Sequence, residues 1–305
     1  MSDTATLTNA RPIVFGEVLF DEFDDGITVL GGAPFNVAWH LQGFSLQPLL
    51  ISRVGADVLG RQVIDTLRQR SMDARGIQID SAHPTGRVQV RIQNGQPSFE
   101  ILPAQAYDFI DNNDTQRALR GVTPALFYHG SLAARGASAT ALKALRSQLT
   151  APAFVDINLR TPWWQRDSVL EMIQNARWLK LNDSELAMML QRSLVTTDDV
   201  VQGARELLER CDCEWLILTL GAEGAMLLSA NAQHSAPAIA TGAIVDTAGA
   251  GDAFSAVMIL GIMLNWDLSL SLQRAVEFAK AVCMQRGATS PELALYSSHL
   301  ERWTA

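Results

Sequence analysis

Short apolar runs with strand character alternate along this chain with stretches whose apolar residues recur at helical spacing. Seven runs are predicted to be strands: residues 11–20, 47–54, 125–129, 153–157, 178–181, 215–220 and 225–228. They are nearly continuously apolar, which is typical of strands buried on both faces of a parallel sheet. The order therefore predicts an α/β fold with a central, mostly parallel sheet and helices on both faces. Such sheets bind ligands at the carboxyl ends of their strands.

Length and composition suit a single domain of this kind. The chain has 305 residues, of which 48% are hydrophobic, and we expect residues 12–300 to form one domain after a frayed N-terminus at 1–11. A net charge of −8 argues against nucleic acid or a membrane surface as a partner. No apolar run is long enough to span a membrane and residues 1–11 lack the apolar core of a signal peptide, so we expect a cytoplasmic protein.

Two segments, at about residues 21–32 and 84–103, depart from the alternation. In the second, apolar residues alternate with polar ones before the dipeptide Asn94-Gly95, which is a strong hairpin signal. We expect these strands to leave the main sheet together and form a small β-strand lid that excludes water from the strand ends. The pattern alone is equally consistent with a surface hairpin, and exposed lid strands could pair two subunits into a homodimer.

The turn DTAGAGDAF (residues 246–254) carries the strongest chemical signal. Gly249, Ala250 and Gly251 precede a helical run, and a glycine turn at a helix start presents free N–H groups and a positive dipole end to an anion such as phosphate. Asp252 would be repelled by that phosphate as a ligand, but it suits a base that takes a proton from an attacking hydroxyl. The alternative is a tight connection with a capping aspartate.

Seven motifs that occur in order along the chain carry a family resemblance. They are GEVLFDEF (16–23), GGAPFNVA (31–38), VGADVLG (54–60), VDINLR (155–160), KLNDSE (180–185), TLGAEG (219–224) and DTAGAGDAF (246–254). Together they resemble the ribokinase-like (PfkB) carbohydrate kinases over about residues 12–292, and the first two are most similar to those of bacterial fructokinases. The resemblance implies a ribokinase-like fold and ATP-dependent phosphorylation of a hydroxyl of a small monosaccharide, with fructose favoured.

The resemblance also implies roles for matching residues around the transferred group and the sugar. Those that match the catalytic base and the anion hole are Asp252, Gly249, Ala250 and Gly251. Those that match sugar-binding positions are Asp21, Gly32 and Asn36. Arg160, at the end of a predicted strand, is the best cation to meet a sugar carboxylate or a charge that develops during transfer. Without the resemblance, Asn36 would more often be a cap or turn residue and Asp21 a solvated loop acid.

On the nucleotide side, the resemblance implies ATP and Mg2+ as cofactors and, in many members, a monovalent cation such as K+. Asn182 and Glu185 match a motif that organises magnesium and the ATP phosphates, largely through water. The positions that match the nucleotide-binding turn are Thr219, Gly221 and Gly224. Asp246 matches the region that holds the monovalent cation. Taken alone, residues 183–185 would be an ordinary acidic first turn of a helix.

Some positions depart from the family pattern, and several functions stay open. Ala248 stands where many members have threonine, and Val276 lies near the position where ribokinases carry an asparagine close to adenine. The substrate could instead be ribose, 2-keto-3-deoxygluconate or an adenosine-like nucleoside. The scaffold could also serve a non-catalytic sugar- or nucleotide-binding protein. A dinucleotide-dependent oxidoreductase is disfavoured, because neither 221–224 nor 249–251 completes the glycine fingerprint of that class.

Overall fold

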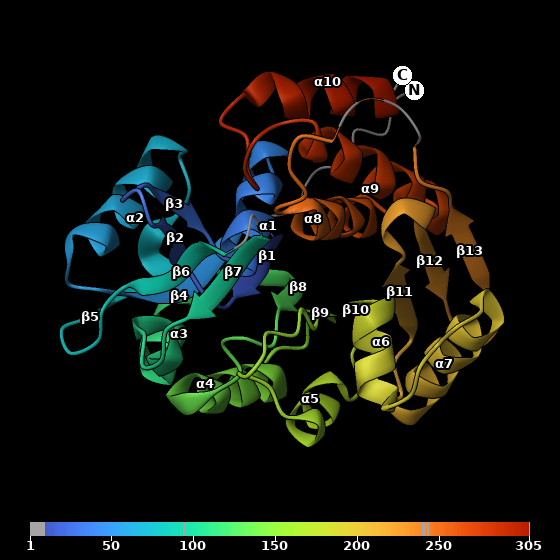
Figure 1. Cartoon of the computed structure of the whole chain (residues 1–305). Coiled ribbons are helices and arrows are strands. Elements are labelled where there is room, and N and C mark those ends of the chain that lie inside the picture. The colour runs from blue at the N-terminus through green and yellow to red at the C-terminus, as the bar shows by residue number, and fades with distance from the viewer. Residues whose placement is uncertain (1–9, 94–95, 240–241, 243, 305) are drawn as a thin grey trace.

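The computed structural model describes residues 10–93, 96–239, 242 and 244–304 of the chain. Its main sheet has nine strands in the order β13-β12-β11-β10-β9-β8-β1-β4-β5 (Figure 1). They are β1 (Ala10–Phe15), β4 (Leu49–Gly55), β5 (Ile77–Asp80), β8 (Thr123–His129), β9 (Ala153–Asp156), β10 (Trp178–Asn182), β11 (Trp215–Thr219), β12 (Ala225–Leu228) and β13 (Gln233–Ala236). Strand β12 pairs antiparallel with both β11 and β13, and the other neighbours pair parallel, which confirms the predicted mostly parallel sheet.

Helices cover both faces of this sheet (Figure 1). They are α1 (Ala33–Gly43), α2 (Val58–Gln69), α3 (Asn112–Ala118), α4 (Gly136–Gln148), α5 (Arg166–Ile173), α6 (Asp183–Leu190), α7 (Thr197–Arg210), α8 (Ala250–Met263), α9 (Leu268–Cys283) and α10 (Leu293–Thr304). Each central strand supplies alternate residues to opposite faces. Val14 belongs to the core beneath α1, α8 and α9, whereas Ile13 and Phe15 belong to the core beneath α4. This explains why the strands are continuously apolar in sequence.

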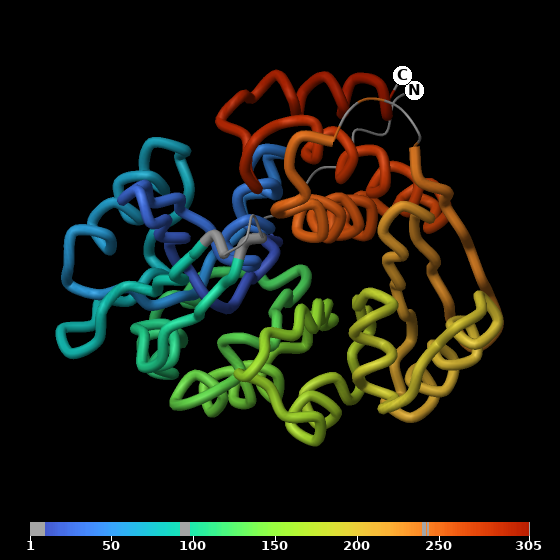
Figure 2. The backbone as a smooth tube through the Cα atoms, in the orientation of Figure 1, coloured from blue at the N-terminus to red at the C-terminus, as the bar shows by residue number. Residues whose placement is uncertain are grey.

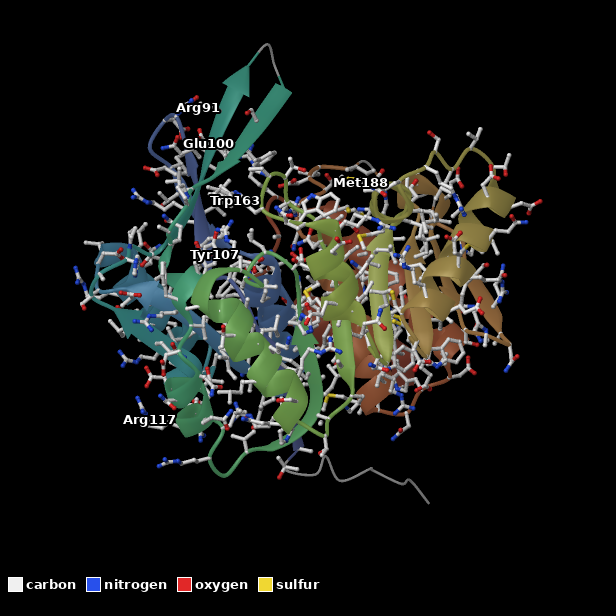
Figure 3. All side chains as sticks on the ribbon, turned by 90° about the horizontal axis from the view of Figure 1, so that it is seen from below. Arg91, Glu100, Tyr107, Arg117, Trp163 and Met188 are labelled. Atoms are coloured by element: carbon white, nitrogen blue, oxygen red, sulfur yellow. The ribbon has the colours of Figure 1, made fainter. Side chains whose placement is uncertain are left out.

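A second sheet, called the lid sheet below, has four strands in the order β3-β2-β6-β7. They are β2 (Leu19–Phe23), β3 (Thr28–Gly31), β6 (Gly86–Gln93) and β7 (Gln96–Ile101). Strands β2 and β6 pair parallel although more than sixty residues separate them, with Leu19 opposite Gly86. Figure 3 shows β6 and β7 projecting beyond the body of the molecule, with Arg91 and Glu100 on them. The expected turn at Asn94-Gly95 lies outside the described residues.

The prediction of one strand over residues 11–20 is wrong, because β1 ends at Phe15 and β2 begins at Leu19 in the other sheet. Gly16 begins the break, with φ at 152°, and a Cβ there would lie 2.4 Å from Cγ of Pro34. The chain then runs through β2 and β3 and enters α1 (Figure 2). Strands β5 and β13 were not predicted, since both are short and partly polar.

Within the described part of the chain, no helix combines the length and the apolar character that crossing a membrane would require.

Candidate active site

The glycine turn begins α8 as the sequence predicts. Gly249 precedes the helix with φ at 73°, a left-handed conformation that favours glycine. A Cβ at this position would lie 2.4 Å from Cβ of Ala288, so the close packing against Ala288 also requires glycine here. The first N–H groups of α8 have no intrahelical acceptor because they lie in its first turn; that of Ala250 donates to the carbonyl oxygen of Thr247 in the preceding turn, at 3.3 Å. The turn can therefore donate several hydrogen bonds to an anion, and the helix dipole favours one there.

Asp252 lies in the first turn of α8 and is half-buried. Its Oδ2 accepts a hydrogen bond of 2.7 Å from Nδ2 of Asn36, which joins the predicted base to a predicted sugar-binding residue 216 positions away. Burial and the charge of Asp156 raise the pKa of Asp252, whereas the Asn36 bond, Lys180 and Arg160 lower it, and the net result is a pKa of about 6. The carboxylate is thus ionised at neutral pH and remains a stronger base than an exposed aspartate.

The predicted sugar-binding residues come together at the turn between the lid sheet and α1. Gly32 is the N-cap of α1, with φ at 105°, and Asn36 lies in the first turn of this helix. A Cβ on Gly31 would lie 3.9 Å from Oδ1 of Asn36 and 4.0 Å from Oδ2 of Asp21. Asp21 is on β2 of the lid sheet, and burial raises its pKa, while Arg160 lowers it. A carboxylate oxygen of Asp21 and the amide oxygen of Asn36 therefore lie close to the Gly31-Gly32 pair.

Arg160 follows β9 and its side chain is exposed. Its positive charge lowers the pKa of three carboxyl groups, those of Glu17, Asp21 and Asp252. The structure therefore brings Arg160 to the same side of the molecule as the predicted base and sugar-binding residues. In Figure 3 Trp163, three residues further on, lies at the edge of the body that faces the lid sheet.

Lys180 is a residue of this site for which the sequence analysis gave no role. It lies on β10, is 5% exposed, and pairs through Nζ with Oδ2 of Asp156 at 2.7 Å. Oγ of Ser255 lies 2.9 Å from the same aspartate oxygen and 3.0 Å from the carbonyl oxygen of Gly251, so that its single proton is shared between these two acceptors. A Cβ on Gly251 would lie 3.5 Å from the lysine Nζ. A buried cation therefore stands directly beside the anion-binding turn, and a lysine within an apolar strand was the available signal.

Asn182 and Glu185 form a capping box at the start of α6. Oδ1 of Asn182 accepts from the N–H of Glu185 at 2.8 Å, and Oε2 of Glu185 accepts from the N–H of Asn182 at 2.9 Å. Oε1 of Glu185 accepts from the N–H of Leu159 at 2.8 Å. Burial raises the pKa of Glu185, and the charge of Asp156 adds to this. The acidic first turn is thus a structural cap that also ties α6 to the loop after β9.

The described residues hold no cluster of three or more histidine, cysteine, aspartate or glutamate side chains that could bind a metal ion. Glu185 offers a single carboxylate, whose oxygens already accept backbone hydrogen bonds. Magnesium keeps several of its waters and takes phosphate oxygens as ligands, so a single carboxylate fits it as an outer ligand.

The predicted nucleotide-binding turn follows β11. Thr219 ends this strand opposite Asn182 on β10, so the two motifs are neighbours at the same sheet edge. Gly221 and Gly224 both have positive φ, at 55° and 100°. A Cβ on Gly224 would lie 2.1 Å from the carbonyl oxygen of Ala236, whereas one on Gly221 would have no atom of the described chain within 4 Å. Gly224 is therefore required by packing, and Gly221 only by its backbone conformation.

Asp246 ties two loops together beside the glycine turn. Its Oδ1 accepts from the N–H of Ala248 and its Oδ2 from the N–H of Gly287, both at 3.0 Å. These bonds give Asp246 a structural role at the position where a monovalent cation was expected. Role and cation are compatible, since each carboxylate oxygen has a further lone pair.

A model of the pfkB family of carbohydrate kinases matches residues 21–294 of the chain. The chain belongs to this family. This carbohydrate kinase is 30% identical to a fructokinase of Klebsiella pneumoniae over 273 residues, which cover 83% of this chain and 85% of that protein. The crystal structure of an uncharacterized sugar kinase, PH1459, from Pyrococcus horikoshii superposes on this chain with a TM-score of 0.76 and a sequence identity of 26%. The match covers 97% of this chain and 100% of that chain.

The ribokinase-like fold is confirmed by the same comparisons. The crystal structure of a fructokinase with bound ATP from Xylella fastidiosa is only 20% identical to this carbohydrate kinase. It nevertheless has a TM-score of 0.82 over 97% of this chain and 99% of that chain. Members of the family are phosphotransferases with a sugar hydroxyl as acceptor, so the enzyme class expected from the sequence is confirmed.

Proposed function

We propose that this enzyme transfers the terminal phosphoryl group of ATP to a hydroxyl of a neutral monosaccharide, with D-fructose as the favoured acceptor. The observation that carries the proposal is the hydrogen bond of 2.7 Å between Asn36 and Asp252. It joins a side chain suited to reading sugar hydroxyls to a carboxylate beside the anion-binding turn. The names of the relatives support fructose, and the ATP bound to one of them supports the donor.

In the proposed reaction Asp252 removes the proton of the acceptor hydroxyl while the hydroxyl oxygen forms a bond to the terminal phosphorus of ATP. The bond from that phosphorus to the bridging oxygen breaks, and ADP leaves. The N–H groups at the start of α8 stabilise the negative charge on the transferred group, and the ammonium of Lys180 beside Gly251 adds to this. Asp252 is ionised and able to act as the base above about pH 6.

Glu185 and Asn182 would hold Mg2+ through water, and the ion would neutralise phosphate charge during the transfer. Asp246 and the adjacent loop at 287–290 are our proposed position for a monovalent cation such as K+. The lid sheet would cover the bound sugar and reduce hydrolysis of ATP by water.

A panel of acceptors with coupled detection of ADP tests the substrate. The panel contains D-fructose, D-ribose, 2-keto-3-deoxygluconate, fructose 6-phosphate and adenosine, and we expect the highest kcat/KM with D-fructose. A higher kcat/KM with 2-keto-3-deoxygluconate would indicate that Arg160 binds the carboxylate of the substrate, and it would overturn the choice of a neutral sugar. The absence of ADP release with every acceptor would contradict catalysis and favour a binding protein.

Asp252→Asn tests the mechanism. We expect kcat to fall on the order of 10²–10⁴ with KM for the sugar nearly unchanged, because the amide keeps the shape but cannot accept the proton. Asp212→Asn, at an exposed position after α7, is the matched control and should keep normal turnover. Near-normal kcat in Asp252→Asn would remove Asp252 as the base.

A further inference from the structure

Glu17 is a buried carboxyl group that none of the roles above uses. It lies in the break between β1 and β2 and is 3% exposed. Its Oε2 has no hydrogen-bond partner among residues 10–93, 96–239, 242 and 244–304. Buried side-chain oxygens normally have a partner, because an unsatisfied one loses its hydration without compensation. A buried carboxyl oxygen without a partner next to a ligand site is therefore a candidate to bind that ligand.

Packing places Glu17 at the glycine pair that carries the sugar-binding residues. A Cβ on Gly32 would lie 2.7 Å from the backbone oxygen of Glu17 and 3.4 Å from its Cγ. A Cβ on the adjacent Gly31 would lie 4.0 Å from Oδ2 of Asp21 and 3.9 Å from Oδ1 of Asn36. The Oδ1 atom of Asn36 is likewise buried without a partner within the described chain. Two buried oxygens without a partner within the described chain, one from Glu17 and one from Asn36, thus lie beside the Gly31-Gly32 pair.

The groups around Glu17 favour its neutral form. Burial raises the pKa of Glu17 to about 7, and the negative charge of Asp252 on α8 raises it as well. The backbone N–H groups of Glu17 and Ala33 and the charge of Arg160 lower it. Tyr107 and Tyr128 also face Glu17, and both stay neutral because burial raises their own pKa values. Because the charge of Asp252 raises the pKa of Glu17, to about 7 against about 6 for Asp252, Asp252 ionises first as the pH rises.

We propose that Glu17 is a further sugar-binding residue, whose protonated carboxyl group donates a hydrogen bond from Oε2 to a hydroxyl oxygen of the acceptor. Asn36 and Asp21 accept hydrogen bonds from sugar hydroxyls, and Glu17 supplies the complementary donor. The inference rests on the proposed function only in that the acceptor occupies this site.

The pH dependence of sugar binding follows from this assignment. Below about pH 7 Glu17 carries its proton and the donor is present, whereas above this pH it ionises and the donor is lost. The affinity for the sugar should then fall as the pH rises. Since Asp252 needs to be ionised, kcat/KM should be bell-shaped, with an acidic limb near pH 6 from Asp252 and an alkaline limb near pH 7 from Glu17.

Calorimetric titration of D-fructose into the wild type, Glu17→Gln and Glu17→Met tests the inference without requiring turnover. At pH 6.5 we expect Glu17→Gln to bind within about twofold of the wild type, because its amide keeps a donor. Glu17→Met keeps the size but loses the donor, and its Kd should rise about five- to tenfold, the effect of one hydrogen bond. Between pH 6.5 and 8.5 the Kd of the wild type should rise, while that of Glu17→Gln should stay constant.

Several outcomes would overturn the inference. They are equal affinity of Glu17→Met and the wild type, the same alkaline weakening in Glu17→Gln, or no binding of D-fructose to the wild type. Melting temperatures of the three proteins distinguish lost binding from lost folding, and weak binding by Glu17→Gln at a normal melting temperature also contradicts a donor role. Binding that follows the expected pattern without ADP release would instead contradict the proposed kinase reaction and leave the assignment of Glu17 standing.

Discussion

Burial and neighbouring side chains shift the pKa of Asp252 in opposite directions and hold it at an intermediate value. Burial and the charge of Asp156 raise its pKa, while Asn36, Lys180 and Arg160 lower it, and the result is about 6. A lower value would make a weaker base, and a higher one would leave the carboxyl protonated at neutral pH. The pKa of this aspartate is thus set by four side chains from three separate segments of the chain, namely α1, residues 156–160 and β10.

Replacing Asn36 should move the acidic limb of the pH profile. In Asn36→Ala the hydrogen bond that lowers the pKa of Asp252 is lost, so the pKa rises and activity begins to fall at a higher pH than in the wild type. The measurement is kcat against pH at saturating sugar. Asn231→Ala, at an exposed turn, should leave the limb in place. A limb at unchanged pH in Asn36→Ala would contradict this account of the Asp252 pKa.

The ion pair of Lys180 and Asp156 permits a test that separates stability from chemistry. Lys180→Met leaves a buried carboxylate without its partner, and we expect a loss of about 3–5 kcal/mol in the free energy of unfolding together with a lower kcat. The double variant with Asp156→Asn removes the unpaired charge and should recover much of the stability but not kcat. Denaturant unfolding and steady-state kinetics measure the two effects. Recovery of kcat in the double variant would restrict Lys180 to a structural role.

At the level of elements, the main sheet could be predicted from sequence because its strands are apolar on both faces. The lid sheet was harder, since residues 11–20 form one apolar run although the chain changes sheet at Gly16. Short pieces such as β5 and β13 have too few apolar residues to give a periodic signal. Among site residues, the motifs identified those that meet at the glycine turns. Glu17 was missed because only the fold shows that its carboxyl group is buried, and Lys180 was missed although a lysine within an apolar strand was a signal for it.

Gly249→Ala should disturb the start of α8 more than its conformation alone would suggest. The added methyl group would overlap Cβ and Cα of Ala288, at 2.4 and 2.6 Å, so either the turn or the loop has to move. We expect kcat to fall on the order of 10²-fold, since a displacement of about 1 Å can have this effect.

Gly121→Ala is the control for that variant, because Gly121 has nearly the same φ, 72° against 73°, but no atom of the described residues lies within 4 Å of the added Cβ. It should lose about 1–2 kcal/mol of stability from the left-handed conformation and keep its kcat. Equal kinetic effects of the two substitutions would show that packing against Ala288 is unimportant.

On the scale of the whole molecule, the lid sheet has two outer strands, β3 and β7, each of which pairs on one side only within the part of the chain that the structure describes. Apolar side chains are exposed near them, with Val29 41% and Phe99 63% exposed. Unpaired strand edges with apolar residues are potential sites of pairing between chains. The possible homodimer that the sequence suggests therefore stays a prediction, and it concerns these two strands.

Sedimentation velocity of the wild type and Phe99→Glu tests this prediction. We expect the wild type to sediment as a dimer and Phe99→Glu as a monomer, because a charge on the shared surface opposes burial. Val195→Glu, at a position that is 85% exposed beside α7, should leave the dimer intact. A monomeric wild type would exclude pairing through the lid sheet under those conditions.

The lid sheet continues into α1 without a linker, since β3 ends at Gly31 and α1 begins at Ala33. Asp21 is part of this sheet, and Asn36, the partner of Asp252, is part of that helix. An acceptor bound by both side chains would hold the lid sheet against the part of the site that contains Asn36 and Asp252. Binding of the acceptor and exclusion of water would then occur together. An enzyme without its acceptor would therefore hydrolyse little ATP.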